Sequence, residues 1–355
     1  MAERMIEVNV AELLPGDILA ADVYSTSGKT LAKKNTVISD NTILGLKKNY
    51  IDSVYIFRDM GYSNPSDFLS IKEILIKEAI EIMDTQVMKF IKKEKNIYEL
   101  KDIIIGLLKN DKIINLMIPL RVMGDNIFRH CVSVAFYSIA VGKEMYFPLN
   151  RLVTLGTAAL LHDVGMTEIP RNIVNKRGTL TETEKMVIQR HPRYGFEIVQ
   201  NAGSFSAEIY NIILEHHERY DGTGYPNGLV NDKIHTMAKI IAVCDVYDAL
   251  TNDRSYRAKH TRSESVEYLL GSGNFYFNHE IVKALINTIV IYRYGQWVEL
   301  STKEIGVVVD DEVEGFKPKP KVMVYFDEEG TQLREPKLVD LSLRESTNIS
   351  ILRNI

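Results

Sequence analysis

The chain has 355 residues, 25% of them charged, and a formal net charge of −4. This length allows one sizeable core and one or two smaller modules. The negative charge argues against a general nucleic-acid-binding protein, although a local basic pocket remains compatible with it. The N-terminus lacks the apolar stretch of a signal peptide, and no apolar run is long enough to span a bilayer. Two cysteines, Cys131 and Cys244, form no disulfide framework and are expected to be buried thiols. We expect a cytoplasmic protein without membrane insertion.

Residues 1–62 have the pattern of a small β-rich module. Short β-prone runs alternate with turn residues, and one helix fits at residues 40–48, with Ser39 or Asp40 as its cap. The composition of residues 62–67 is that of a linker. We expect this module to regulate the chain or to bind protein partners through residues 1–60.

The period of the apolar residues becomes helical after this linker. Residues 63–118 form the predicted helical linker, in which apolar residues recur at steps of three and four between residues 68 and 109. Two interpretations are open: an amphipathic pair of helices packed on the neighbouring core, or a coiled coil that joins two copies of the chain. Residues 119–292 are predicted to be almost entirely helical. Residues 293–355 are predicted to be a β-rich extension with four short strands, at WVELS, IGVVVDD, KVMVYFD and KLVDLS. The expected fold class is therefore mainly α.

The most informative stretch lies between residues 160 and 249, where histidines and aspartates gather in short motifs. Each alone has an ordinary structural explanation, such as a helix cap or an exposed histidine at a helix end. Together they supply nitrogen and oxygen ligands without a thiolate, a set that suits iron, manganese or zinc. Two metals sharing a carboxylate accommodate such a set, and a two-metal site favours phosphoester hydrolysis. The seven candidate ligands are His130, His162, Asp163, His191, His216, His217 and Asp245.

Local context adds to this set. Asp245 lies in the strongly apolar segment 239–250, where a carboxylate is costly to bury unless it is paired or bound to a metal. Asp248 lies three residues later on the same helical face and is expected to orient a ligand or a water. His191 precedes a proline at a predicted helix start, and we expect it to be exposed. Three other histidines, His235, His260 and His279, are expected to be surface or capping residues.

Four motifs follow one another in the chain: HDVG at 162–165, HPRYG at 191–195, HHERYDGTGYP at 216–226 and DRSYR at 253–257. In their order and spacing they resemble the HD-GYP family, over roughly residues 120–290. Members of this family are HD-superfamily phosphodiesterases that hydrolyse the bacterial second messenger cyclic di-GMP. The resemblance implies a helical bundle with its metals at the centre. Residues 12–39 loosely resemble the small domain found ahead of many HD-GYP domains.

The resemblance also implies roles for individual residues. It places one metal on His130, His162, Asp163 and Asp245 and a second on His191, His216 and His217. Both ions are divalent, with iron or manganese favoured, and Asp163 and a hydroxide bridge them. In the substrate site Tyr225 of the Gly224-Tyr225-Pro226 turn contacts a guanine, and Arg254 and Arg257 bind the phosphates. Asp248 supports the metal ligands, and with Asp163 it is the predicted catalytic pair. The hydroxide attacks one phosphodiester of cyclic di-GMP to yield linear pGpG, which some members cleave further to GMP.

Two positions depart from the family pattern. Met166 stands where members commonly carry a lysine, and a methionine cannot donate to a phosphate. Asn126 stands where members with three metals carry a glutamate, so we expect two metals. Three functions remain open: an active cyclic di-GMP phosphodiesterase, a catalytically weak cyclic di-GMP sensor, and a phosphodiesterase for another cyclic dinucleotide.

Overall fold

The structure is a computed structural model, and its chain divides into two compact units, residues 1–71 and 72–355. It describes residues 4–13, 17–25, 30–33, 36, 38–58, 65–92, 96–176, 178–252, 260–310, 319–346 and 348–355. In this part of the chain no helix is both long enough and apolar enough to cross a membrane.

The N-terminal unit is β-rich, as predicted. Its strands are β1 (Arg4–Asn9), β2 (Ile18–Leu19), β3 (Val23–Tyr24), β4 (Thr30–Ala32) and β5 (Ser53–Arg58). Strands β1, β5 and β2 form one antiparallel sheet, and β3 pairs with β4. Helix α1 (Asp40–Lys48) has the predicted bounds, and the side chain of Ser39 caps it in a capping box with Thr42. Buried apolar residues such as Ile38, Leu46 and Ile56 form the core of this unit.

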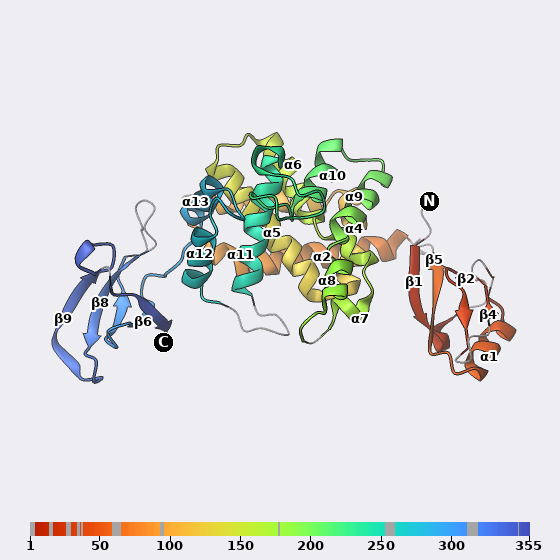
Figure 1. The fold of residues 1–355 in the computed structure, drawn as a ribbon, viewed down its shortest axis with the longest axis horizontal. Coiled ribbons are helices and arrows are strands. Elements are labelled where there is room, and N and C mark those ends of the chain that lie inside the picture. Colours follow the sequence, from red (N-terminus) through yellow and green to blue (C-terminus); the bar gives the residue numbers. More distant parts are fainter. Residues whose placement is uncertain are drawn as a thin grey trace. The chain divides into compact units, whose positions relative to one another are not determined.

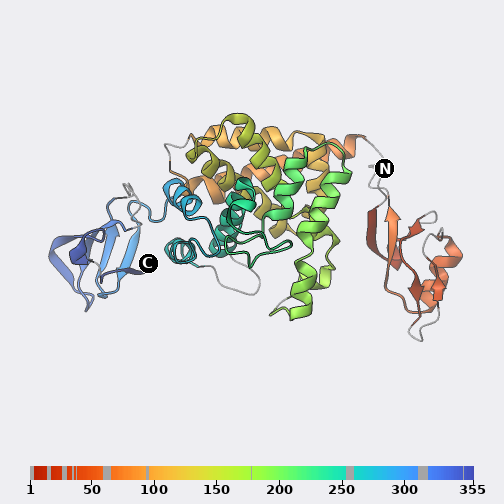
Figure 2. The same ribbon diagram turned by 45° about the horizontal axis from the view of Figure 1, so that its top comes forward.

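The second unit contains the helical bundle (Figures 1 and 2). Its helices are α3 (Ile97–Leu108), α4 (Asp111–Met123), α5 (Asp125–Glu144), α6 (Leu149–Leu161), α7 (Arg171–Val174), α8 (Glu182–Ile188), α9 (His191–Asn201), α10 (Ala207–Glu215), α11 (Thr236–Thr251), α12 (Arg262–Gly271) and α13 (His279–Thr288). Helix α2 (Pro65–Ile82) precedes them and crosses the boundary between the units. The bundle confirms the expected mainly α class.

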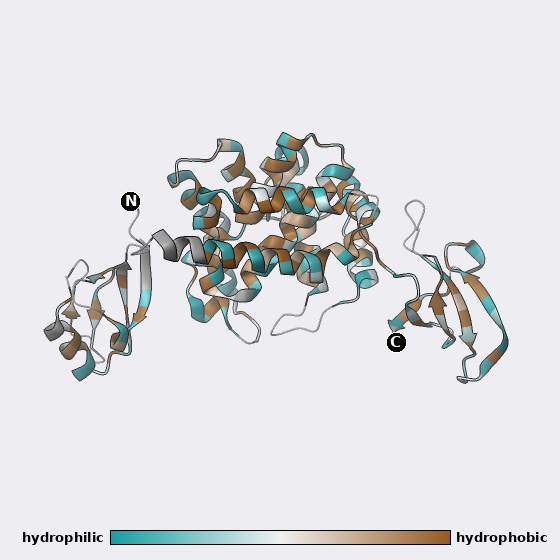
Figure 3. Cartoon of the chain, turned by 180° about the vertical axis from the view of Figure 1, so that it is seen from behind, coloured by the Kyte–Doolittle hydropathy of each residue, from teal (hydrophilic) through white to brown (hydrophobic). Residues whose placement is uncertain are grey.

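Helix α5 forms the centre of the bundle, where α3, α4, α6, α11 and α13 all pack against it. Every residue from 131 to 142 is buried, and most of them are apolar, as expected for a helix segment surrounded by others. The outer helices carry both hydrophilic and hydrophobic residues (Figure 3). Cys131 and Cys244 are buried free thiols, as predicted.

Two helices, α2 and α3, occupy the predicted amphipathic stretch at residues 68–109. Between them the helical period breaks into a π-helical turn, Met83–Val87, and a 3-10 turn, Met88–Phe90. The prediction that this region joins two copies of the chain stays a prediction.

A five-stranded antiparallel sheet follows the bundle, in the order β10-β6-β7-β8-β9. Its strands are β6 (Trp297–Leu300), β7 (Ile305–Val308), β8 (Lys321–Phe326), β9 (Gln332–Asp340) and β10 (Ile351–Asn354). Buried valines and leucines on one face, such as Val298, Leu300 and Val324, give it a core of its own. The sequence pattern predicts the first four strands but not β10. The division into four domains at residues 62, 118 and 292 stays a prediction.

Candidate metal centre

All seven predicted metal ligands converge inside the bundle, although they come from five separate segments. His130 lies in the first turns of α5, and Asp245 in the middle of α11. His162 caps the C-terminus of α6 and Asp163 follows it, while His216 and His217 follow α10 in the same way. His191 is the first residue of α9. Three groups place their donor atoms within 4.8 Å of one another: His191, His216 and His217; His130, His162 and Asp245; and His162, Asp163 and His216.

The Asp163 carboxylate lies between two of these groups. Its Oδ1 atom is 3.2 Å from Nε2 of His191. Its Oδ2 atom is 3.6 Å from Nε2 of His162 and 4.0 Å from Nε2 of His130. The two oxygens therefore face different sets of histidines, which is the arrangement that a bridging carboxylate requires.

Three of the histidines are oriented by the same kind of local hydrogen bond. In each, Nδ1 donates to the backbone carbonyl three residues earlier: His162 to Ala159 at 2.7 Å, His191 to Ile188 at 2.7 Å and His216 to Ile213 at 2.6 Å. A ring that carries its proton on Nδ1 has a lone pair on Nε2, the tautomer that binds a metal. The helix ends thus turn the lone pairs of three buried imidazoles toward one another.

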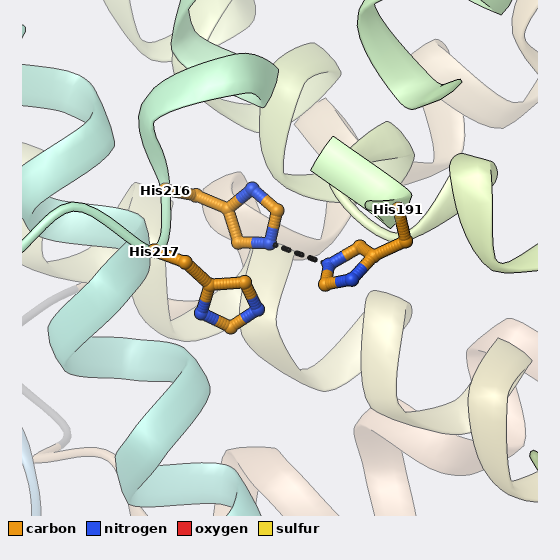
Figure 4. A group of neighbouring side chains, drawn as sticks. All are labelled: His191, His216 and His217. Atoms are coloured by element: carbon orange, nitrogen blue, oxygen red, sulfur yellow. Dashed lines mark hydrogen bonds between the residues drawn. The ribbon is translucent and has the colours of Figure 1, made fainter. Parts of the chain in front are cut away.

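These lone pairs need a positive partner. Nε2 of His191 lies 3.2 Å from Nε2 of His216 (Figure 4). Burial, followed by the charges of the neighbouring histidines, holds the pKa of His216 well below its usual value, so this ring is neutral. Either a proton on His191 or a metal ion must lie between the two nitrogens. Nε2 of His162 is buried and has no hydrogen-bond partner among the described residues. A metal ion meets the requirements of all three atoms, and the residues present therefore fit the predicted cofactor.

His130 is held differently, by two carboxylates. Its Nδ1 donates to Oδ2 of Asp248 at 2.7 Å and its Nε2 to Oδ1 of Asp245 at 2.9 Å. Burial opposes the charged ring, but these two bonds prevail and raise the pKa of His130 to about 10. Asp248 is 3% exposed, and its other oxygen accepts from Nδ2 of Asn252 at 2.7 Å. Asn252, Asp248 and His130 thus form a chain that ends at the metal centre, a common way of orienting a histidine ligand. Binding of a metal through Nε2 of His130 would release the proton that this nitrogen donates to Asp245.

The carboxylates and His217 have shifted pKa values that suit ligands. Burial alone would raise the pKa of Asp163 and Asp245, but the surrounding histidines hold both well below the usual range. Burial, with a further contribution from His191, lowers the pKa of His217 to about 3. Two ionised carboxylates and a neutral imidazole are the protonation states in which these groups bind cations.

Comparison with known proteins agrees with this geometry. Residues 125–281 match a family model described as "HD domain". The chain is 32% identical over 232 residues to a cyclic di-GMP phosphodiesterase of Pseudomonas aeruginosa, covering 65% of this chain and 56% of that protein. It is 42% identical over 147 residues to the cyclic di-GMP phosphodiesterase response regulator RpfG of Xanthomonas campestris, covering 41% of this chain and 39% of RpfG. The chain contains an HD domain, in agreement with its resemblance to the HD-GYP family.

A relative whose name gives a different substrate is also similar to this chain. It is the 3′3′-cGAMP-specific phosphodiesterase 2 of Vibrio cholerae, 33% identical over 158 residues, with 44% of this chain and 30% of that protein covered. The chain thus spans between about a third and about half of the length of these three curated relatives.

The turn that gives the HD-GYP family its name lies beside the metal centre. The ring of Tyr225 is 4.8 Å from the ring of His217, and the Tyr225 backbone N–H donates to the His217 carbonyl. Burial, and then the nearby Asp245 and Asp163, raise the pKa of Tyr225, which keeps its hydroxyl protonated. Gly224 leaves no room for a side chain, because a Cβ there would lie 2.2 Å from the backbone nitrogen of Arg219. Pro226 is exposed.

Glu218 anchors this turn, a role that the sequence pattern did not reveal. The side chain is 3% exposed and follows directly after His217. Its Oε1 atom accepts from the backbone N–H of Asn227 at 2.6 Å, and its Oε2 from that of Leu229 at 2.9 Å. A buried carboxylate with two backbone donors therefore connects the metal-ligand segment to the residues just after Pro226.

Two glycines let the ligand-bearing segments approach. A Cβ on Gly165 would lie 2.0 Å from the His191 carbonyl oxygen and 2.4 Å from the backbone nitrogen of Gly195. Asp163 stands just before the 3-10 helix Val164–Glu168, and this turn packs against α9, which begins with His191. The close contact of the two segments thus brings Asp163 to within reach of His191.

The remaining predicted positions have mixed outcomes. The prediction that His191 is exposed is wrong: the ring is 2% exposed, because α9 packs its first turn against the turn after α6. His235 caps α11, as predicted, by accepting from the Met237 N–H. Asn126 is exposed, and Met166 is half-buried in the 3-10 turn after Asp163. Arg254 and Arg257 lie outside the described residues.

Proposed function

We propose that this protein is a metal-dependent phosphodiesterase that hydrolyses cyclic di-GMP to linear pGpG. The observation that carries the proposal is the Asp163 carboxylate, whose two oxygens face two separate groups of histidines. The names of the relatives support a cyclic dinucleotide as substrate. Two divalent ions, iron or manganese, are the proposed cofactors. When bound, they make a nucleophile available at neutral pH and neutralise the charge that develops on the phosphate.

The chain's own residues then have distinct tasks. His130, His162, Asp163 and Asp245 would hold one ion, and His191, His216 and His217 would hold the other. The Asp163 carboxylate faces both groups, and Asp248 fixes the His130 ring through its 2.7 Å hydrogen bond. Tyr225, half-buried and in ring contact with His217, stands where a base of the substrate can stack. Arg254 and Arg257 stay proposed phosphate contacts.

An assay of products tests this proposal. The full chain is prepared without oxygen, loaded with Fe(II) or Mn(II) and given cyclic di-GMP; pGpG and GMP are then separated by chromatography, with metal content measured on the same sample. We expect two metals per chain and pGpG as product. The variant Asp163→Asn, which removes the charge of the bridge, is expected to lose both; Asp232→Asn, at an exposed residue outside the site, is the control. Full activity and metal content in Asp163→Asn would exclude the proposed centre.

Two further functions have specific support. Met166 follows the Asp163 turn, where its backbone N–H donates to the Asp163 carbonyl at 2.8 Å, and it cannot supply a cation to a phosphate. This favours a cyclic di-GMP sensor of low turnover. If Met166→Lys greatly raises turnover without changing binding, the native chain acts mainly as a sensor. The Vibrio cholerae relative favours 3′3′-cGAMP as an alternative substrate, which the same assay distinguishes by its products.

A further inference from the structure

We propose that Arg219, held on the ring of Tyr276, recognises the O6 and N7 atoms of one guanine of the substrate. The inference deepens the proposed function and rests on it. It would make Arg219 a specificity-determining residue, because it favours guanine over adenine at one of the two base positions.

The backbone of Arg219 is fixed although its side chain is exposed. The residue follows the buried Glu218, and its backbone nitrogen packs against Gly224, where no side chain would fit. The next two residues pair with a distant segment: the Tyr220 N–H donates to the Tyr276 carbonyl at 3.0 Å, and the Asp221 N–H to the Phe275 carbonyl at 2.8 Å. Residues 275–276 are therefore attached to the loop that carries the Gly-Tyr-Pro turn.

The Arg219 side chain lies over an aromatic ring. Its Cζ atom is 4.3 Å from the centroid of the Tyr276 ring, which is a cation–π contact. Stacking covers a face of the guanidinium and leaves the N–H groups at its edge available. In the described part of the chain the Arg219 side chain has no hydrogen bond or ion pair. Nearby Asp221 is engaged elsewhere, because its carboxylate accepts from the N–H and the hydroxyl of Thr223.

The backbone of Arg219 lies beside the residues that lead to the metal centre. Arg219 follows His217 by two residues, and its backbone nitrogen packs against Gly224, whose neighbour Tyr225 contacts the His217 ring at 4.8 Å. A nucleotide whose phosphate lies at the metal donors extends its base away from them. Tyr225, Tyr276 and Phe275, which is 66% exposed, place aromatic rings on this loop and its partner segment.

The chemistry of these groups favours a base over a phosphate. Purines stack on aromatic rings, whereas a phosphate has no flat face to stack. The forked edge of arginine matches the two adjacent acceptors of guanine, O6 and N7; adenine offers a donor in place of O6 and breaks the match. Arg219 therefore discriminates guanine from adenine by a bidentate contact.

Binding measurements on hydrolysis-resistant phosphorothioate analogues test this assignment separately from turnover. Isothermal titration of the full, metal-loaded chain compares the analogues of cyclic di-GMP and cyclic di-AMP, which carry the same phosphates. We expect Arg219→Gln to weaken binding of the guanine analogue by about tenfold to 100-fold, the worth of one bidentate contact, with little change for the adenine analogue. Arg219→Lys, which keeps the charge but loses the fork, is expected to give the same selective loss.

Each other outcome overturns the assignment. An equal loss for both analogues, restored by lysine, would place the guanidinium on a phosphate; no loss for either would remove it from the substrate site. Arg193→Gln is the matched control, since Arg193 is an exposed arginine over the ring of Phe196. Tyr276→Leu removes the stacking partner alone and is expected to give a smaller loss of the same selectivity. If the product assay shows no turnover while the selective binding is intact, the proposed phosphodiesterase activity is rejected. The guanine contact of Arg219 is then retained.

Discussion

Nε2 of His191 faces Nε2 of His216 at 3.2 Å, and in both rings the other nitrogen is engaged by a backbone carbonyl. Two buried lone pairs at this distance repel each other unless a cation lies between them. Hydrogen bonds to the backbone thus orient both ligands without a metal. The free-energy cost of holding the two nitrogens close together falls on folding and not on metal binding. The same principle applies to His162, whose buried Nε2 has no hydrogen-bond partner in the described part of the chain.

Asp248→Asn is expected to weaken metal binding without removing any ligand. The substitution keeps the shape of the side chain but removes the charge that orients His130 at 2.7 Å. Loss of such a partner typically lowers metal affinity or activity about tenfold to 100-fold. Titration of the metal-depleted chain with Mn(II) measures the effect. Asn252→Ala, one step further from the metal, should have a smaller effect in the same direction; unchanged affinity in both variants would exclude this support.

The stability of the chelator-treated protein is expected to fall as pH rises above neutrality. The folded-state pKa of His130 is raised from 6.5 to about 10, so the protonated ring stabilises the fold. This contribution is fully present below pH 6.5 and is lost as pH rises from 6.5 through 10. Thermal unfolding in EDTA at several pH values in this window measures it. In His130→Gln the additional slope should disappear; an equal slope in both proteins would assign the effect to other groups.

Gly165→Ala is expected to disrupt the metal centre, although Gly165 is not one of the proposed metal ligands. The added methyl would lie 2.0 Å from the His191 carbonyl oxygen, so the turn after Asp163 and the first turn of α9 must separate. Overpacking of this kind typically costs about 1–3 kcal/mol, and the separation moves Asp163 from His191. Thermal unfolding and metal content give the two readouts. Gly271→Ala is the control, because a Cβ there meets nothing within 4 Å.

Glu218→Ala is expected to loosen the Gly-Tyr-Pro turn and to leave the metal ligands bound. It removes the acceptors of the Asn227 and Leu229 N–H groups. Both hydrogen bonds are partly buried, and a hydrogen bond to a charged group typically contributes about 1.5–3 kcal/mol. If cyclic di-GMP is the substrate, KM should rise more than kcat falls, with metal content unchanged. A fall in metal content equal to that of Asp163→Asn would show that Glu218 supports His217 rather than the turn.

The elements that the sequence predicted well are those that depend on local patterns. The bounds of α1 and its cap at Ser39 follow from a capping box within four residues. The positions of His162 and His216 at helix ends follow from apolar periodicity that stops there. The position of the break at residues 83–90 and the strand β10 were not predicted, because short irregular turns and edge strands carry little periodic signal.

The sequence by itself determined which atoms are available for a metal: five imidazoles and two carboxylates, ordered in the motifs of one family. It could not determine how these atoms face one another. His130 and Asp248 are 118 residues apart, Arg219 and Tyr276 are 57 apart, and the Gly165–His191 contact joins two separate elements. Only packing of the helices brings such pairs together, since periodicity records which face of a helix is buried but not which residue it meets. The division of the Asp163 oxygens between two groups of histidines was therefore decided by the tertiary structure.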